Sequence, residues 1–304
     1  MKRITILFCS LFLISFSSLF SQNFGTFASA VWLTDCTTSN FFNTTGEGPS
    51  LIGPPENVFT NTNFGVFIQN SGTFILRGGE VKTFKNSNGN ACSVRMNYRI
   101  YLESDTPGGF NTIDFPFFND CNTVISEFPS GGPCGEGDQK WQRVIADGET
   151  TPFAPIDLTT FAPGNYVLEV FFEATGDLNS STECDDIVFV NDGGNNYKAF
   201  FSVRTNPTFI SSNPSTCSGA DGSITLSNLN PDSTYAFSYS DGGSTIGPNS
   251  ITADNNGEFI LSNLTAGNYS NFNFAINNCS TTVNNSVILN DPTINPPTSS
   301  GNTE

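Results

Sequence analysis

The sequence predicts an all-β protein made of two tandem antiparallel β-sandwich modules of the immunoglobulin-like type. Thirty phenylalanines stand beside 28 glycines and 17 prolines among 304 residues, which is typical of short aromatic strands separated by turns. Apolar and polar side chains alternate with a period of two in many segments, as in strands with one buried face. Strong helix formers do not gather in any run, so we expect no long α-helix.

The first module is expected over residues 22–204. Its clearest strand is "CSVRMNYRIYL", whose alternation gives one face to Cys92, Val94, Met96, Tyr98, Ile100 and Leu102. The segment "NNYKAFFSV" repeats the pattern with Tyr197, Ala199, Phe201 and Val203. Because each strand has one apolar face, both fit an antiparallel sheet that covers a core on one side.

The second module is expected over residues 205–292. Five segments, "GSITL", "TYAFSYS", "GEFILSNL", "NYSNFNFAI" and "NSVIL", read as strands. Turn signals such as Asp241-Gly242-Gly243 and Asn256-Gly257 separate them at near-regular spacing, which is typical of an immunoglobulin-like sandwich. The remaining residues, 293–304, form a Pro/Ser/Thr-rich tail or linker.

The first 21 residues are typical of a secretory signal peptide. Lys2 and Arg3 precede an apolar run from Ile4 to Phe20, and Ser21 is a small residue at a plausible cleavage edge. No later run is long and apolar enough to cross a bilayer. We therefore expect a secreted or cell-surface protein without membrane insertion.

The charge balance limits the partners. The chain has 28 acidic against 11 basic residues, a net charge of −17. Such a surface repels nucleic-acid phosphates and anionic membranes. We expect neither as a partner, which leaves surface glycans or other surface proteins.

One short sequence motif occurs twice. "FAPGNY" begins at Phe161 and "LTAGNY" at Leu264, and a strand-like run follows each. We interpret Gly164 and Gly267 as glycines that allow the turn. We interpret Tyr166 and Tyr269 as tyrosine-corner residues whose hydroxyls bond back to the loop. The alternative is that the same common turn simply occurs at both positions.

Seven cysteines follow the predicted leader, and disulfides are their default state in an exported protein. Cys217 and Cys279 are the only two in the second module, so we expect them to pair. Cys121 and Cys134 flank a polar loop and are expected to close it. The pairing of Cys36, Cys92 and Cys184 stays open.

The second module resembles the SprB-type repeat of Bacteroidetes surface and gliding adhesins. The resemblance rests on Cys217, Asp221-Gly222-Ser223, Tyr235 to Tyr239, Leu264 to Tyr269, Cys279 and Asp291-Pro292. "SGTFILRGGEVKTFKN", "GDQKW" and "PGNYVLEVFFEATG" resemble an uncharacterised N-terminal domain of secreted flavobacterial proteins. These resemblances imply a surface location and export by type IX secretion. Because the sequence shows no C-terminal sorting domain, we expect either a fragment of a longer protein or export by another route.

Few side chains suggest chemistry. The chain has no histidine, which removes His-dependent triads and the usual zinc enzymes. A carboxylate pair for glycoside hydrolysis stays open, with no spacing that selects among Asp114, Glu127, Asp138, Glu169 and Glu173. The segment "ECDDIVFVNDGGNN" brings Asp185, Asp186 and Asp192 together as calcium-type ligands, or as parts of an ordinary hairpin.

The sequence thus predicts a non-catalytic adhesion or structural module without a cofactor or metal. The alternative is an accessory carbohydrate-binding region of an exported polysaccharide-degrading protein. Trp32 and Trp141 are its two candidate sugar platforms, although both lie in strand-like contexts that favour packing.

Overall fold

The computed structural model describes residues 23–86, 89–144, 154–178, 183–276 and 279–293. Within these ranges the chain forms β-strands, with no α-helix and with short 3-10 turns at η1 (Gly48–Ser50), η3 (Leu158–Thr160) and η4 (Asp192–Gly194). The expected all-β class is confirmed. The predicted signal peptide and all but the first residue of the predicted tail lie outside the described residues.

Two six-stranded sheets form the N-terminal module. The first has the order β2-β1-β4-β8-β7, with β9 also paired to β4. Its strands are β1 (Phe24–Asp35), β2 (Thr38–Thr45), β4 (Phe74–Lys85), β7 (Phe117–Asp120), β8 (Gln139–Arg143) and β9 (Ile156–Asp157).

The second sheet of this module has the order β3-β12-β10-β5-β6, with β11 also paired to β10. Its strands are β3 (Asn63–Ile68), β5 (Asn90–Leu102), β6 (Asn111–Phe115), β10 (Gly164–Asp177), β11 (Asp186–Val190) and β12 (Tyr197–Arg204). The edge pair β3–β12 is parallel, unlike the others. These two strands are far apart in sequence, so no hairpin turn dictates their relative direction.

The period-two pattern places the core between these sheets. Val94 and Met96 of β5 are buried in it together with Phe172 of β10 and Phe201 of β12. Phe67 and Phe74 stack at 4.5 Å between ring centroids and join the two sheets. The abundance of phenylalanine is therefore explained by the need to fill a wide interface between two sheets.

The C-terminal module has a three-stranded sheet, β13-β14-β17, and a four-stranded sheet, β16-β15-β18-β19. Tyr235, Phe237, Tyr269, Phe272 and Phe274 fill the space between them. The strands are β13 (Thr208–Ser212), β14 (Gly222–Ser227), β15 (Thr234–Asp241), β16 (Ser244–Thr252), β17 (Phe259–Leu264), β18 (Gly267–Ile276) and β19 (Cys279–Leu289).

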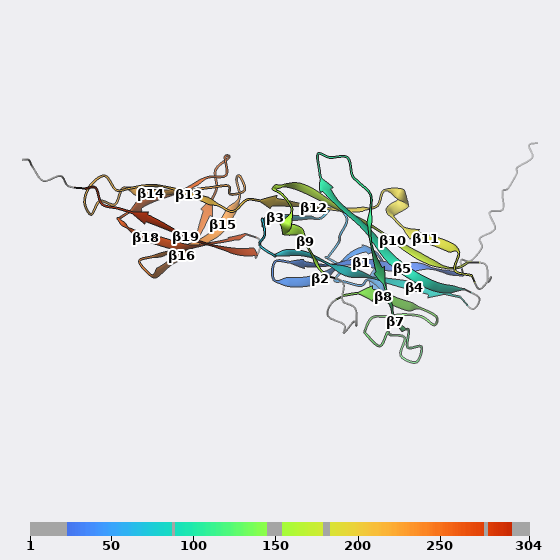
Figure 1. Cartoon of the computed structure of the whole chain (residues 1–304). Helices are drawn as coiled ribbons and strands as arrows, with labels where there is room; N and C mark the ends of the chain where they lie inside the picture. Colours follow the sequence, from blue (N-terminus) through green and yellow to red (C-terminus); the bar gives the residue numbers. More distant parts are fainter. Residues whose placement is uncertain (1–22, 87–88, 145–153, 179–182, 277–278, 294–304) are drawn as a thin grey trace, which may run out of the picture.

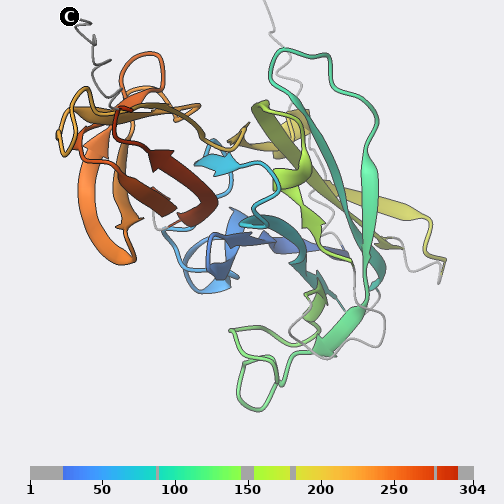
Figure 2. The ribbon, with the colours of Figure 1, turned by 60° about the vertical axis from the view of Figure 1, so that its left-hand side comes forward.

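The modules lie end to end, and the two ends of the described chain are at opposite ends of the molecule (Figure 1). The turned view in Figure 2 shows the C-terminal strands as a separate group beside the edge of the N-terminal sheets. At the junction, Phe67 and Arg204 of one module and Tyr235 and Phe274 of the other line a cavity of only about 20 Å³. The modules therefore pack directly against each other.

Candidate functional site

The repeated phrase forms a tyrosine corner in each module. The Tyr166 hydroxyl donates to the Ala162 carbonyl at 2.7 Å, and the Tyr269 hydroxyl donates to the Thr265 carbonyl at 2.9 Å. Tyr166 is 5% exposed and Tyr269 is 1% exposed. Each ring thus fills its own core while its hydroxyl satisfies a carbonyl four residues earlier.

The role expected for the two glycines is wrong. Neither Gly164 nor Gly267 has a positive φ angle, so neither turn requires a residue without a side chain. At Gly267 an added Cβ would lie 3.6 Å from its nearest neighbour, which is ordinary contact. At Gly164 it would lie 2.4 Å from Leu102 Cδ2, so that glycine makes room for the Leu102 side chain on β5.

Three disulfides are present among the described residues: Cys121–Cys134, Cys92–Cys184 and Cys36–Cys279. The Cys121–Cys134 bond agrees with the expectation. The expected Cys217–Cys279 bond is wrong, because Cys279 bonds to Cys36 and Cys217 is an exposed free thiol. Cys217 is thus the odd cysteine of the seven.

The geometry of β19 explains this error. Cys279 begins β19 at the junction, whereas Cys217 lies beside Pro292, which follows the other end of that strand. Eleven residues of strand separate these positions, which is roughly 35 Å. Disulfides require Cα atoms within about 7 Å. Cys217 and Cys279 therefore belong to opposite ends of the C-terminal module.

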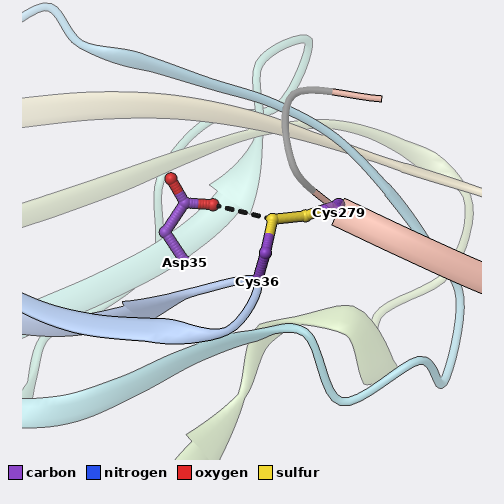
Figure 3. Close-up of side chains that lie close together, drawn as sticks. All are labelled: Asp35, Cys36 and Cys279. Atoms are coloured by element: carbon purple, nitrogen blue, oxygen red, sulfur yellow. Dashed lines mark hydrogen bonds between the residues drawn. A yellow bond between two sulfur atoms is a disulfide. The ribbon is translucent and has the colours of Figure 1, made fainter. Parts of the chain in front are cut away.

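The Cys36–Cys279 bond joins the first described strand to the last. Cys36 directly follows β1, and Cys279 is the first residue of β19 (Figure 3). Cys279 is buried against the core of the N-terminal module. A covalent path consequently runs along β1, through two sulfur atoms and along β19.

Asp35 lies beside this bond, with its Oδ1 3.3 Å from Cys36 Sγ (Figure 3). Asp35, Cys36 and Cys279 form the one group among the described residues whose potential metal ligands lie within 4.8 Å of one another. The two sulfur atoms are bonded to each other and are not thiolates, so the group does not have the donors of a metal site. Burial raises the pKa of Asp35 above its usual value.

A second cluster lies on the outer face of the first sheet, where strands usually carry solvated side chains. Glu80 and Lys82 of β4 stand opposite Gln142 and Lys140 of β8, and all four side chains are buried. Lys140 Nζ lies 3.7 Å from Glu80 Oε1 and donates to the Gly131 carbonyl at 2.7 Å. Sequence reasoning did not find this cluster, because alternation alone assigns these residues to solvent.

Residues 121–134, here called the stapled loop, cover the cluster. The Cys121–Cys134 disulfide closes this loop, and Phe128 within it is buried. Lys82 Nζ and Lys140 Nζ lie 5.7 and 5.0 Å from the centroid of the Phe128 ring. The loop is therefore anchored by one aromatic ring that two ammonium groups contact.

A cavity of about 320 Å³ opens between the stapled loop and the sheet. The four charged and amide side chains line it from below, and Ser130, Gly131 and Gly132 line it from the loop. Trp32 of β1 and Phe41 of β2, with ring centroids 4.3 Å apart, form part of its wall. We call this cavity the buried-lysine pocket.

The two tryptophans differ in their environment. Trp141 is 6% exposed, and its indole Nε1 donates to Thr83 Oγ1 at 3.0 Å inside the core. It therefore packs in the core and offers no platform to a sugar. Trp32 lies on the outer face and lines the buried-lysine pocket.

The candidate carboxylates are dispersed over the N-terminal module. Asp114 and Glu173 both face Arg95, at 3.9 and 3.6 Å, on the outer face of the second sheet. Glu127 belongs to the stapled loop. Asp138 precedes β8 and accepts from the Gly135 N–H at 2.7 Å.

Glu169 has a distinct environment, which the sequence did not reveal. It is 1% exposed and accepts two hydrogen bonds from Arg99, one from Tyr101 and one from Asn196. Burial acts to raise the pKa of Glu169, but the hydrogen bonds from Arg99, Asn196 and Tyr101 outweigh it and hold the pKa below its usual value. These contacts satisfy the carboxylate and support a structural role.

The proposed calcium ligands do not gather in one place. Asp186 accepts from the Leu178 N–H at 2.8 Å, and the five residues of β11 lead from it toward Asp192. Asp192 lies in η4, where the Asn191 side chain accepts from the Gly194 N–H. The segment is a 3-10 turn and not the hairpin that was the alternative, because β11 and β12 both pair with β10 and not with each other.

No helix among the described residues is long and apolar enough to cross a membrane. No family model and no curated protein matches the chain. Solved structures with similarity include the chicken CNTN1 FN1–FN3 domains (10% identity, 83% of this chain and 70% of that chain, TM-score 0.22). The four N-terminal Ig domains of Dscam1 are 11% identical, over 83% of this chain and 52% of that chain, with a TM-score of 0.19. The Bacillus cereus major pilin BcpA is 9% identical, over 90% of this chain and 92% of that chain, with a TM-score of 0.20. TM-scores this low carry no argument about this chain.

Proposed function

We propose that this chain is a non-catalytic extracellular module of a structural or adhesive kind that keeps its length under tension. The Cys36–Cys279 disulfide carries this proposal, because it joins the end of β1 to the start of β19. These strands run from the junction toward opposite ends of the molecule (Figure 1).

A force applied at the two ends follows this covalent path. The two strands are already extended at about 3.3 Å per residue, and a stretched chain reaches about 3.6 Å. Their further lengthening is therefore on the order of 10 Å. The residues between Cys36 and Cys279, a separation of 243 positions, lie inside the covalent ring and carry no tension.

Location and resemblance support the same proposal. Disulfides persist in oxidising compartments outside the cytosol, and the described chain contains three. The predicted signal peptide and the resemblance to SprB-type surface repeats agree with a cell-surface role.

Single-molecule stretching tests the proposal. With handles at both termini, the oxidised protein should lengthen little when pulled. The Cys36→Ser/Cys279→Ser variant should unfold its modules and release roughly 500–540 Å of additional chain, because the intact Cys92–Cys184 bond still withholds 92 of the 243 positions. The Cys92→Ser/Cys184→Ser variant is the matched control and should stay short, because its bond lies inside the larger ring.

Two results would contradict the proposal. One is an oxidised protein that lengthens by several hundred ångströms at the forces that unfold the Cys36→Ser/Cys279→Ser variant. The other is antibody labelling that finds the protein inside the cells of its source and not at their surface or in the medium.

A further inference from the structure

The buried-lysine pocket contains an arrangement that the fold alone does not require. Lys82 and Lys140 are directly opposite each other on β4 and β8, and both are almost fully buried. Like charges in directly opposite cross-strand positions are destabilising. Burial adds a desolvation cost to each ammonium. Apolar side chains at these positions would give a more stable sheet.

Lys82 is the less satisfied of the two. It is 2% exposed, and no hydrogen bond or ion pair joins its ammonium to any of the described residues. Its contacts are the ring of Phe128 and the close approach of the loop at Gly132, where an added Cβ would lie 3.2 Å from Nζ. Its three N–H donors therefore face the cavity without a hydrogen bond to any described residue.

The surrounding charges do not replace that acceptor. Burial lowers the pKa of Lys82, and Lys140 acts in the same direction, while Glu80 and Asp138 oppose the shift. Glu80 is committed at least in part to Lys140, at 3.7 Å. A group that carries negative charge and fits inside the cavity would supply the acceptor that Lys82 lacks among the described residues.

The other walls define the rest of such a ligand. Glu80 and Gln142 offer oxygen acceptors and an amide donor, the partners that hydroxyl groups require. Trp32 and Phe41 offer apolar aromatic surface, against which the C–H face of a sugar ring packs. The cavity of about 320 Å³ is at the small end of ligand pockets, a size that suits one ring.

We propose that the buried-lysine pocket binds a carboxylate-bearing sugar ring, with the carboxylate on Lys82, hydroxyl groups on Glu80 and Gln142, and the ring against Trp32. The stapled loop then has a clear purpose: its disulfide and the Phe128 anchor hold Gly131 and Gly132 as the upper wall. This site lies away from the Cys36–Cys279 bond and shares only Trp32 of β1 with the tension-bearing path.

Calorimetric titration with galacturonate tests the proposal, with galacturonate methyl ester and galactose as uncharged ligands of matched shape. Galacturonate should bind, and both neutral sugars should bind at least about tenfold more weakly, since a charged hydrogen bond is lost. Lys82→Met should reduce galacturonate binding by a similar factor. Its melting temperature should be unchanged or higher, because the variant removes a buried unpaired charge. Lys198→Met, on β12 of the other sheet, is the control and should bind normally.

Each other outcome is decisive. Acetate that binds as tightly as galacturonate would show a simple anion site and overturn the sugar assignment. Absence of galacturonate binding, or binding unchanged in Lys82→Met, would overturn the proposal. If Lys82→Met does not fold, Trp32→Leu replaces it and should weaken galacturonate binding about tenfold. Unchanged binding in that variant would also refute the site.

Discussion

The paired tyrosine corners allow one perturbation to be made twice in one molecule. Tyr166→Phe and Tyr269→Phe each remove a hydroxyl whose bond to the backbone measures 2.7 or 2.9 Å. The accepting carbonyls belong to Ala162 and Thr265, which are exposed, so water replaces part of the lost bond. We therefore expect a cost of about 0.5–1.5 kcal/mol in each module, the range of a net hydrogen bond.

The same free energy should shift the two melting temperatures differently. The C-terminal module runs from β13 to β19 and is about half the length of the N-terminal one. A loss of about 1 kcal/mol lowers the midpoint by roughly 4–8 °C in a domain of that smaller size and by roughly 2–4 °C in the larger. Tyr→Ala should cost about 3–5 kcal/mol in either module, because it also leaves a ring-sized cavity.

Differential scanning calorimetry resolves the two transitions. Tyr239→Phe and Tyr98→Phe are controls, since neither hydroxyl makes a hydrogen bond among the described residues. Both controls should melt like the parent protein. If Tyr269→Phe melts like Tyr239→Phe, the hydroxyl bond contributes nothing and the corner interpretation fails.

Three further predictions concern other features. Glu169→Gln should lower the melting temperature at neutral pH. Because the pKa of Glu169 in the folded protein lies below its usual 4.5, the stability that its charge provides is present above that value and is lost as pH falls below it. In thermal melts from pH 7 to 3, the difference in melting temperature between the variant and the parent should therefore narrow. Cys121→Ser/Cys134→Ser opens a ring of separation 13, worth about 3 kcal/mol in the chain-entropy model, and should lower the N-terminal midpoint by roughly 6–12 °C in calorimetry. Gly267→Ala should be neutral or stabilise by up to about 1 kcal/mol in urea denaturation, whereas Gly164→Ala should destabilise because its Cβ meets Leu102.

The part of the fold that the sequence could predict is the part that local pattern determines. β5 was expected from the alternation of Val94 and Met96 with polar residues, and both side chains are in the core. The tyrosine corners could be predicted from the sequence because they are local: each tyrosine hydroxyl donates to a carbonyl only four residues earlier. In both cases the deciding contacts lie on one strand or in one turn.

The disulfide pairing and the charged cluster could not be predicted, because they depend on which strands pair and in which register. The pairing of Cys279 follows from which end of β19 meets the other module, and no local pattern encodes that. The cluster on the outer face arises because β4 pairs with β8 so that Lys82 meets Lys140, while a distant loop covers both. On its own, each strand only suggested a charged side chain facing solvent.

The order of the three disulfides along the chain has a consequence for how the protein is made. Cys121–Cys134 lies within Cys92–Cys184, which lies within Cys36–Cys279, so the rings are concentric in sequence. Cys36 leaves the ribosome before the other cysteines of the described chain, yet its partner is synthesised last. Until Cys279 arrives, five other thiols are available to Cys36, among them Cys217, which forms no disulfide with any described residue. Correct oxidation therefore requires Cys36 to stay reduced while the two inner disulfides form. The Cys36–Cys279 disulfide then forms last, after both modules have folded and packed against each other.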